Sequence, residues 1–433
     1  MSGRIVGIRR EDKNVWERRT PLTPEAVRHL TARGIHFRIQ PSPNRIFPDE
    51  AYVQAGAILS EDLSSCDVVF GVKEMPVNFF QRGKTYVFFA HVIKGQSYNM
   101  PMLKRLMERE CTLIDYERIV DDRGKRLVFF GVHAGIAGMI DSFWALGRRL
   151  EAEGIETPFA RIRQAKDYPS LHEARRSIRG VANLLFEQGL PAVLRPFVVG
   201  FLGYGHTSEG AQSIFDLFPH VTLEPDELFG LKSDASVSER ILYKVIFHKP
   251  HMYRHRKGHP FKLDTFNQHP DEYESGLEPY LPHLTMLMNC IYWEPRFPKL
   301  LTRDMLIELY RDRPRLRVIG DVTCDIRGAL DCTVRATTPG NPVYVYLPDR
   351  DEGVDGVDGH GPVVLAVDNL PCEISREASE YFSQVLLPFV PEIVNCEYDQ
   401  PFDRLPLSLP IRRAVIVHRG NLTPDYEYLR KFL

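Results

Sequence analysis

The feature that most restricts the fold is an apolar run, Phe197–Leu202, followed at once by a glycine-rich turn and then by residues with helical spacing. The turn reads Gly-Tyr-Gly-His-Thr-Ser-Glu-Gly over residues 203–210. A second short run, residues 220–223, ends at Glu224, which stands 21 residues after Gly203. Strand, tight turn, helix and strand in this order are typical of an α/β sheet. The order therefore predicts an α/β fold.

The N-terminal part of the chain repeats this alternation. RIVGIRR is followed by TPEAVRHLTARG, HFRIQ, DEAYVQAGA and DVVFGV. Thr23 before Pro24 is a typical helix start, and Gly34 stands where that helix would end. Because 433 residues exceed one ordinary hydrophobic core, we expect two Rossmann-like α/β domains with parallel sheets and an active-site cleft between them.

The glycine turn has the chemistry of a phosphate site. Glycines let the backbone approach a pyrophosphate closely, and the free N–H groups at the start of the following helix hold its charge. We predict that the turn binds a nicotinamide dinucleotide. The expected cofactor residues are Gly203, Tyr204, Gly205, His206, Thr207, Gly210, Glu224, Asn289 and Tyr292. The third glycine lies two positions beyond its usual place, so a glycine turn without a ligand is the alternative.

Charged residues after the turn bear on the choice of cofactor. An acid at Glu224 favours NAD, because it repels the 2′-phosphate of NADP. A basic set that could instead neutralise that phosphate comprises Lys232, Arg240, Lys244, His248, Lys249, His251, Arg254, His255, Arg256, Lys257 and His259. Its histidines also suggest a metal site. Since Lys and Arg alternate with them, a solvated basic loop is favoured and no metal is expected.

These signals predict how the chain is divided. Helical spacing from Gly135 to Gly154 indicates a long connecting helix. We assign residues 1–140 and 371–433 to a substrate and catalytic domain, and residues 141–370 to a dinucleotide-binding domain. Residues near 234–278 are rich in His, Lys, Pro and Tyr with weak periodicity, so we expect an insertion there.

Composition excludes several classes of function. Lys plus Arg number 55 and Asp plus Glu number 57, so no overall field favours nucleic acid or an anionic membrane. No apolar run reaches the ~18 residues of a membrane span, and the charged N-terminus is unlike a secretory signal. The 7 cysteines are scattered, which is typical of reduced thiols. We expect a cytoplasmic protein with small-molecule partners, and the sequence leaves a homo-oligomer open.

Polar residues follow two apolar runs of the N-terminal domain. Lys73 and Glu74 follow DVVFGV, and His91 and Lys94 follow YVFFA. Such folds bind ligands at the ends of their parallel strands, so these side chains are candidates for catalysis. A lysine and a histidine held together could transfer protons near neutral pH, because burial or neighbouring cations lower the pKa of a lysine. Ordinary solvated lysines are the alternative.

Long blocks around these residues resemble one enzyme family. The blocks are REDKNVWERRTPLTP, GVKEMP, FFAHVIKGQ, LIDYERIVDDRGKRLVFFGVHAGIAGMID, NCIYWEPRFPKLLTR, DVTCDIRG, and DNLP followed by REASEYF. Together they run over nearly the whole chain and resemble lysine–2-oxoglutarate reductase, the saccharopine-forming half of α-aminoadipic semialdehyde synthase. Saccharopine dehydrogenase and alanine dehydrogenase are more distantly similar.

The resemblance implies roles for individual residues. Lys73 and His91 would form the acid–base pair, and Arg19 would bind a substrate carboxylate. Further positions that resemble the family's pocket are Glu74, Lys94, Glu117, Arg126 and, on the nicotinamide side, Asp321. His133 stands where relatives carry an aromatic residue, so the amine donor or the keto acid could differ from those of the family.

The resemblance also implies a reaction. The ε-amine of lysine would join the keto carbon of 2-oxoglutarate, and hydride from NADPH, with NADH as the alternative, would reduce the imine to saccharopine or a similar opine. No metal is needed. Two other functions stay open: an NAD-dependent oxidative dehydrogenase acting on saccharopine or an amino acid, and a non-catalytic nucleotide-binding regulatory protein.

Overall fold

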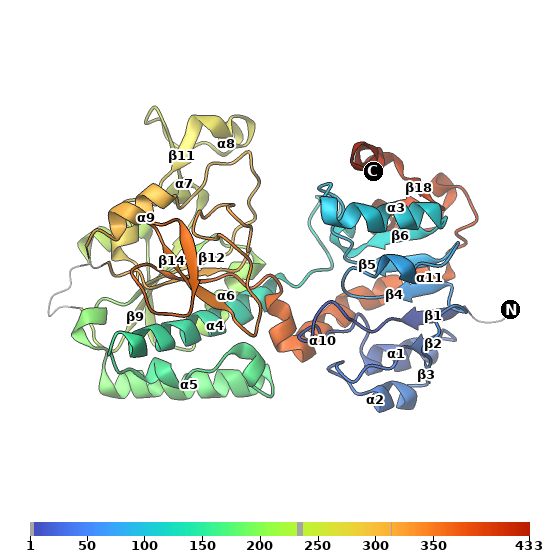
Figure 1. The fold of residues 1–433 in the computed structure, drawn as a ribbon, viewed down its shortest axis with the longest axis horizontal. Helices are drawn as coiled ribbons and strands as arrows, with labels where there is room; N and C mark the ends of the chain where they lie inside the picture. The colour runs from blue at the N-terminus through green and yellow to red at the C-terminus, as the bar shows by residue number, and fades with distance from the viewer. Residues whose placement is uncertain (1–3, 232–236, 313) are drawn as a thin grey trace. The chain divides into compact units, whose positions relative to one another are not determined.

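The computed structural model describes residues 4–231, 237–312 and 314–433. The chain divides into two compact units (Figure 1). Unit 1 comprises Met1–Phe130 and Ser375–Leu433, and unit 2 comprises Gly131–Ile374. Each unit contains an eight-stranded sheet with connecting helices, which confirms the predicted α/β fold class. Lys232 and the first residues of the expected insertion, 234–236, lie outside the described residues.

The sheet of unit 1 has the order β18-β17-β6-β5-β4-β1-β2-β3. Its parallel strands are β1 (Ile5–Ile8), β2 (His36–Ile39), β3 (Ile58–Leu59), β4 (Val68–Phe70), β5 (Thr85–Phe88) and β6 (Thr112–Asp115). The hairpin of β17 (Val415–His418) and β18 (Asn421–Leu422) extends the sheet antiparallel to β6. Strands β4 and β5 are buried throughout, as expected for parallel strands covered on both faces.

The helices of unit 1 come from both ends of the chain. They are α1 (Pro24–Thr31), α2 (Asp49–Gln54), α3 (Met100–Glu108), α10 (Ser375–Leu386), α11 (Val390–Asn395) and α12 (Leu409–Ala414). The predicted start of the first helix is confirmed, because Thr23 Oγ1 accepts the N–H of Ala26 and Pro24 occupies the first turn. Gly34 follows its end with φ +86°.

The sheet of unit 2 has the order β15-β14-β16-β13-β12-β7-β9-β8. Its parallel strands are β7 (Val198–Leu202), β8 (His220–Leu223), β9 (Leu242–Phe247), β12 (Met286–Asn289), β13 (Val318–Asp321) and β16 (Val363–Leu365). Strands β14 (Val343–Leu347) and β15 (Glu352–Asp355) are antiparallel. The strand that follows β7 and α6 in the chain, β8, is an edge strand and does not pair with β7.

The expected insertion at 234–278 is only partly what the structure shows. Strand β9 lies inside this range, pairs with both β7 and β8, and is therefore part of the central sheet. The strand was not predicted because its sequence, LYKVIF, contains the charged residue Lys244. In the structure Lys244 is buried, and its Nζ donates to Asp216 Oδ1 at 2.6 Å. The rest of the segment forms α7 (Lys249–Met252), β10 (Tyr253–His255), α8 (Leu263–Gln268) and β11 (Tyr273–Ser275), with β10 and β11 as a separate two-stranded sheet.

Close packing of two helices supports the glycine turn of unit 2. The helices of the unit are α4 (Gly131–Ala152), α5 (Leu171–Gln188), α6 (His206–Phe215), α7, α8 and α9 (Arg303–Leu309). A Cβ at Gly135 would lie 1.9 Å from Thr207 O, and one at Gly210 would lie 2.1 Å from Val132 O. Only glycine fits at these two contacts, so they bring α4 and α6 backbone to backbone.

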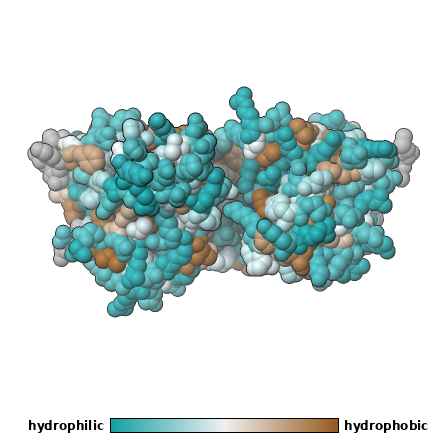
Figure 2. All heavy atoms as spheres, turned by 90° about the horizontal axis from the view of Figure 1, so that it is seen from above, coloured by the Kyte–Doolittle hydropathy of each residue, from teal (hydrophilic) through white to brown (hydrophobic). Residues whose placement is uncertain are grey.

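The apolar cores follow the division into units. One core fills unit 1, and two cores cover the opposite faces of the unit 2 sheet, as the alternation of Val198 and Val199 in β7 shows. The face drawn in Figure 2 is mostly hydrophilic, with hydrophobic residues in small separate patches. Within the described part of the chain, no helix combines the length and the apolar character needed to cross a bilayer.

Candidate active site

The sheet of unit 1 gathers the predicted catalytic residues at one edge. Strands β1, β4, β5 and β6 are parallel, and the sheet places them next to one another in the order β6-β5-β4-β1. Glu11 follows β1, Lys73 follows β4, His91 follows β5 and Glu117 follows β6. The carboxyl ends of neighbouring parallel strands meet at one edge, where such sheets bind ligands.

His91 is held in a defined orientation. Its Nδ1 lies 2.6 Å from Glu74 Oε1, and Lys13 Nζ lies 3.3 Å from Glu74 Oε2. Burial opposes ionisation of Glu74, but the hydrogen bond and charge of His91, with the neighbouring lysines, outweigh it and hold the pKa of Glu74 below its usual range. Because a carboxylate can only accept, Nδ1 carries the hydrogen of this bond, and Nε2 is the ring nitrogen that Glu74 does not engage.

The backbone at His91 is unusual. Its φ is 47°, in the left-handed region of the backbone. Residues other than glycine rarely adopt this conformation, and those that do often lie at functional sites. Asn99 holds this bend by donating from Nδ2 to Ala90 O at 3.0 Å and to His91 O at 3.2 Å. Beside this bend the imidazole contacts Glu74, which lies in the segment after the neighbouring strand β4.

The environment of Lys73 favours its neutral form. Burial lowers the pKa of Lys73, and the positive charges of Arg19 and Lys13 lower it further. The amide N–H of Lys73 donates to Glu11 Oε2 at 2.9 Å, and that of Val72 donates to Glu11 Oε1 at 2.7 Å. The backbone at Lys73 is therefore fixed, and the pKa of its amine is lower than that of an ordinary lysine.

Arg19 is buried and held by Glu17. Arg19 Nε lies 2.8 Å from Glu17 Oε1, Nη2 lies 2.6 Å from Oε2, and the guanidinium stacks over Phe130 at 4.3 Å. Sequence reasoning named Arg19 but missed Glu11 and Glu17, although all three lie in the block REDKNVWERR. The signal that could have found the two acids is their position beside several Lys and Arg residues in this one block.

The remaining predicted substrate residues of unit 1 differ in their surroundings. Arg126 Nη2 forms an ion pair with Glu117 Oε1. The N–H of Glu117 donates to Asp115 Oδ1 at 2.8 Å, and Asp115 is fully buried, which raises its pKa to about 7 with help from the charge of Glu117. Lys94 is exposed, and its N–H donates to Gln96 Oε1 at 3.0 Å.

The glycine turn of unit 2 fits a pyrophosphate. Gly203 has φ +89°, and a Cβ there would lie 2.9 Å from Ile291 Cγ2, so only glycine suits this position. Gly205 caps α6, and a Cβ there would have no heavy atom within 4 Å, which leaves open space in front of the first helical turn. His206 and Thr207 begin that turn, where helix N–H groups favour an anion.

Asn289 and Asp321 form a buried polar pair at the ends of β12 and β13. Asn289 Nδ2 donates to Asp321 Oδ1 at 2.9 Å and to Thr323 Oγ1 at 2.9 Å. Asn289 Oδ1 is buried and has no hydrogen-bond donor in the described chain, so it can accept from a ligand. Asp321 also accepts from Thr333 and from the N–H of Cys324, which makes it a positioning group, and burial raises its pKa.

Other predicted residues of unit 2 lie elsewhere. Glu224 was expected at the ribose because it ends the second strand of the motif, but β8 is not the neighbour of β7, so that basis is lost. Glu224 is exposed and forms a capping box with Glu227. Gly210 packs against Val132 as described above. Tyr292 is 67% exposed, and His133 is buried in α4.

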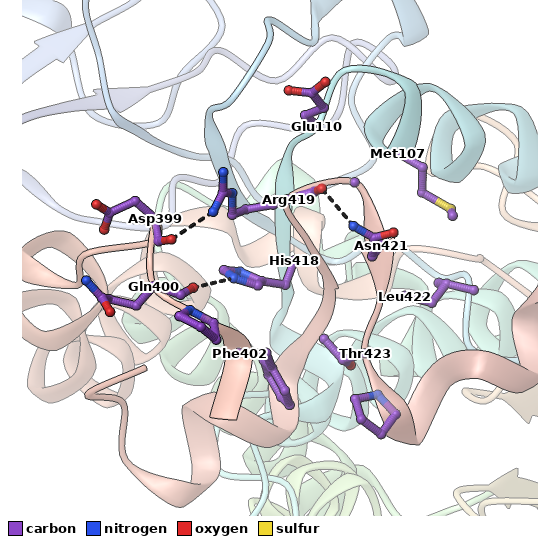
Figure 3. A pocket seen from close by; sticks show the side chains of 13 residues that line it. Met107, Glu110, Asp399, Gln400, Phe402, His418, Arg419, Asn421, Leu422 and Thr423 are labelled. Carbon is purple, nitrogen blue, oxygen red and sulfur yellow. Dashed lines mark hydrogen bonds between the residues drawn. The ribbon is translucent and has the colours of Figure 1, made fainter. Parts of the chain in front are cut away.

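A pocket of about 670 Å³ opens at the other edge of the unit 1 sheet (Figure 3). His418 Nε2 lies 2.9 Å from Gln400 O, and Arg419 Nη1 donates to Asp399 O at 2.7 Å. β17 runs antiparallel to β6, so His418 lies beside Thr112 at the amino end of β6. None of the predicted site residues lines this pocket. Among the described residues, no group of three or more His, Cys, Asp or Glu side chains could hold a metal ion.

Two family models match the chain in order. The alanine dehydrogenase/PNT N-terminal domain matches residues 7–137, and the alanine dehydrogenase/PNT C-terminal domain matches residues 294–425. Among solved structures, an L-alanine dehydrogenase is 17% identical with a TM-score of 0.62 over 99% of this chain and 100% of its own. A transhydrogenase from Sinorhizobium meliloti is 14% identical with a TM-score of 0.57 over 97% of this chain and 100% of its own. These two structures share the fold.

Curated relatives are more similar in sequence. The α-aminoadipic semialdehyde synthase of Arabidopsis thaliana is 37% identical over 98% of this chain and 41% of its own length. The mitochondrial α-aminoadipic semialdehyde synthase of Mus musculus is 35% identical over 99% of this chain and 48% of its own length. The NAD(+), L-lysine-forming saccharopine dehydrogenase of Neurospora crassa is 28% identical over 90% of this chain and 91% of its own length.

The chain thus spans less than half the length of the two synthases, and the two matched domains together cover more than half of the chain. The chain belongs to the alanine dehydrogenase/PNT family, and along nearly its full length it is similar to α-aminoadipic semialdehyde synthases and to saccharopine dehydrogenases.

Proposed function

We propose that this chain catalyses the NADPH-dependent condensation of L-lysine with 2-oxoglutarate to give saccharopine. The family places it among NAD(P)-dependent oxidoreductases that act on a CH–NH bond. The observation that carries the proposal is that Lys73, whose pKa is lowered, and His91, whose Nδ1 is fixed by Glu74, follow the neighbouring parallel strands β4 and β5. A protein that only binds nucleotides has no need of such a pair.

The residues of unit 1 suit the proton transfers of this reaction. Neutral Lys73 accepts a proton from the substrate ammonium, so that the amine can attack the keto carbon. His91, protonated at Nε2 as well as Nδ1, donates to the hydroxyl that leaves as water, and a protonated imine forms. Arg19, fixed by Glu17, offers a guanidinium for a carboxylate of the keto acid. The reduced nicotinamide, when bound, supplies the hydride for the imine carbon.

The residues of unit 2 would hold the cofactor. Gly205 leaves room for the pyrophosphate, Gly203 allows the tight turn through its positive φ, and the first turn of α6 supplies N–H groups for the charge. Asn289 offers an unused buried oxygen to a donor on the nicotinamide half. Asp321 fixes the amide of Asn289 through its Nδ2.

The test is oxidation of NADPH and of NADH at 340 nm with 2-oxoglutarate and a panel of lysine, ornithine and alanine, with mass analysis of the product. We expect rapid oxidation that requires lysine and yields saccharopine. Activity with another amine only would keep the mechanism and change the substrate. Tight nucleotide binding without turnover would contradict the enzymatic proposal and favour a regulatory protein.

We also propose the cytoplasm as the compartment and small molecules as the partners. No disulfide joins the described cysteines, which suits a reducing compartment. The name of the mouse relative places that protein in mitochondria. Fractionation of cells that produce the chain decides between the two compartments.

A further inference from the structure

The sheet order of unit 2 indicates which strand end would lie beside the adenosine ribose of a bound dinucleotide. Strands β9 and β8 lie on one side of β7, and β12 and β13 lie on the other. Dinucleotides lie across such a reversal of strand order, with one half on each side. Neighbouring strands are about 4.8 Å apart, so the end of β9 lies about 5 Å from β7 and the end of β8 about 10 Å. The ribose next to a bound pyrophosphate would therefore lie beside the residues after β9.

Those residues are basic. His248, Lys249 and His251 follow β9 directly, and residues 248–263 contain no Asp or Glu. In the NAD-binding version of this fold, an acid at the corresponding strand end accepts from the ribose 2′-hydroxyl, whereas cations there accommodate a 2′-phosphate. A phosphate gains from charged donors in a way that an uncharged hydroxyl does not.

Side-chain contacts connect this segment to the glycine turn. The ring of Tyr204, inside the turn, stacks on the ring of His248 with centroids 4.5 Å apart and planes 24° apart. The N–H of His248 donates to His251 Nδ1 at 3.4 Å, so the hydrogen of neutral His251 is on Nε2, where it can be donated. Lys249 Nζ lies 5.5 Å from the centre of the Phe266 ring.

The nearest acids of the neighbouring strand are occupied. Glu224 and Glu227 close a capping box at the start of η7 (Pro225–Gly230), with Glu227 Oε2 accepting the N–H of Glu224 at 2.7 Å. Their carboxylates are therefore used by the backbone of that segment. Of the two strands on this side of β7, β9 is therefore the one whose end presents available charged side chains next to the glycine turn.

We propose that His248, Lys249 and His251 bind the 2′-phosphate of NADPH, with Tyr204 holding His248 in place. This inference rests on one part of the proposed function, the binding of a nicotinamide dinucleotide by unit 2. It does not depend on the amine or the keto acid.

The experiment is calorimetric titration of the full chain with adenosine 2′,5′-bisphosphate and, separately, with ADP, which carries no 2′-phosphate. We expect the wild type to bind the 2′,5′-bisphosphate at least tenfold more tightly. Lys249→Gln and His251→Gln should each weaken its binding about three- to tenfold and leave ADP binding unchanged. His248→Asp should lower affinity for the 2′,5′-bisphosphate more than tenfold while ADP binds equally or better, because a carboxylate repels a phosphate and accepts from a hydroxyl.

Further variants and outcomes show whether a loss of binding comes from misfolding, from the wrong strand end or from a failed cofactor proposal. Asp is a favourable residue at the N-cap that His248 occupies, so the fold should tolerate His248→Asp. Glu224→Gln tests the rival assignment of the ribose to the end of β8, and this inference expects it to change neither affinity. Two results would overturn this inference while leaving the proposed function intact. The wild type could bind both nucleotides equally, or Glu224→Gln could change the preference while His248→Asp does not. No binding of either nucleotide would overturn the cofactor part of the proposed function as well, whereas failed turnover with both bound would leave this inference intact.

Discussion

Glu11 shows how a buried carboxylate fixes the backbone of the proposed base. Its two oxygens accept the N–H groups of Val72 and Lys73, and a Cβ at Gly71 would lie 3.4 Å from Glu11 Oε1. Burial raises the pKa of Glu11 to about 7, the charge of Glu17 adds to this, and the two backbone hydrogen bonds oppose it. Glu11 thus acts through Lys73 as a positioning residue.

Replacement of the proposed base tests its role directly. Lys73→Met and His91→Gln should each lower kcat by roughly 10²-fold or more, given the usual contribution of acid–base groups, with the Kd of NADPH nearly unchanged. Because activity requires neutral Lys73, the wild-type rate should rise with pH through a pKa below 10.5, and Lys73→Met should lose this rise. Lys84→Met, at the amino end of β5, is the control. Unchanged turnover in Lys73→Met would remove the proposed role.

Glu11→Gln tests positioning separately from chemistry. A glutamine offers one acceptor oxygen where the carboxylate offers two, so one of the two backbone N–H groups loses its partner. We expect kcat to fall about tenfold, on the scale of one lost hydrogen bond to a charged group, with the KM for NADPH unchanged. Steady-state kinetics together with circular dichroism check this. A loss of folded protein with normal kcat in the remaining fraction would assign Glu11 a purely structural role.

At the scale of elements, α4 and α6 place the glycine turn. Their backbones touch at Gly135 and Gly210, where no side chain fits. Gly205, only five positions before Gly210, faces open space instead. Glycine is therefore needed at the two positions for different purposes. At Gly210 it allows close helix packing, and at Gly205 it leaves room in front of the helix.

Substitution of these two glycines by alanine separates the reasons. Gly210→Ala should lower the free energy of unfolding by about 1–3 kcal/mol, because its methyl group meets Val132 O. Gly205→Ala should leave stability nearly unchanged and weaken nucleotide binding at least tenfold. Urea unfolding and calorimetry measure the two effects. Normal binding by a stable Gly205→Ala variant would argue against a pyrophosphate at this turn.

A buried carboxyl pair joins α4 to η10 (Leu370–Ile374). Asp141 Oδ1 accepts the N–H of Ala165 at 2.7 Å, and Glu373 Oε2 accepts the N–H of Lys166 at 3.3 Å. We infer that the two carboxyl groups share one proton, because Asp141 Oδ2 and Glu373 Oε1 are both buried and neither has a hydrogen-bond partner among the described residues. Burial raises the pKa of Asp141 to about 6, and burial with the charge of Asp141 raises that of Glu373 well above its usual range. Lys166 opposes both shifts, and Asp167 adds to that of Asp141.

The pair predicts a dependence of stability on pH. Both pKa values are higher in the folded chain than in the unfolded one, so the contribution of the pair is complete at acid pH and is lost as the pH rises through about 6. From pH 5 to pH 8 we expect a loss of roughly 1–3 kcal/mol from this source. Glu373→Gln keeps both hydrogen bonds without a second charge, so its stability relative to wild type should increase over that range. Parallel urea titrations check the difference, and a difference that does not vary with pH would contradict the shared proton.

Particular elements show how far the sequence led. The predicted start of α1, the glycine turn before α6 and the polar residues after β4 and β5 follow from local rules, and the structure contains all of them. The position of β9 did not follow, because strand pairing is a long-range property and the buried Lys244 disguised the strand. The same long-range pairing removes one basis for assigning Glu224 to the ribose, and that assignment stays a prediction. Glu11 and Glu17 were missed because their role depends on folded contacts with Lys73 and Arg19.

At the scale of the whole molecule, unit 2 is one continuous segment inserted into unit 1. The chain enters it at Gly131 and leaves it after Ile374. No apolar core of the described residues contains side chains from both units. Each sheet is thus stabilised by its own core, and a ligand that binds one unit should stabilise that unit first.

Hydrogen exchange with bound ligands tests this separation. A ligand at about 100 times its Kd stabilises the folded state that binds it by about 2.7 kcal/mol, which slows exchange through unfolding about 100-fold. With NADPH, we expect this protection for the amides of β7, β9 and β12, and less than about threefold for those of β4, β5 and β6. With 2-oxoglutarate alone, the order should reverse, because Arg19, Lys73 and His91 belong to unit 1. Equal protection of both sheets by either ligand would show that the two units unfold together, and protection of β4 to β6 by NADPH alone would move the dinucleotide site to unit 1.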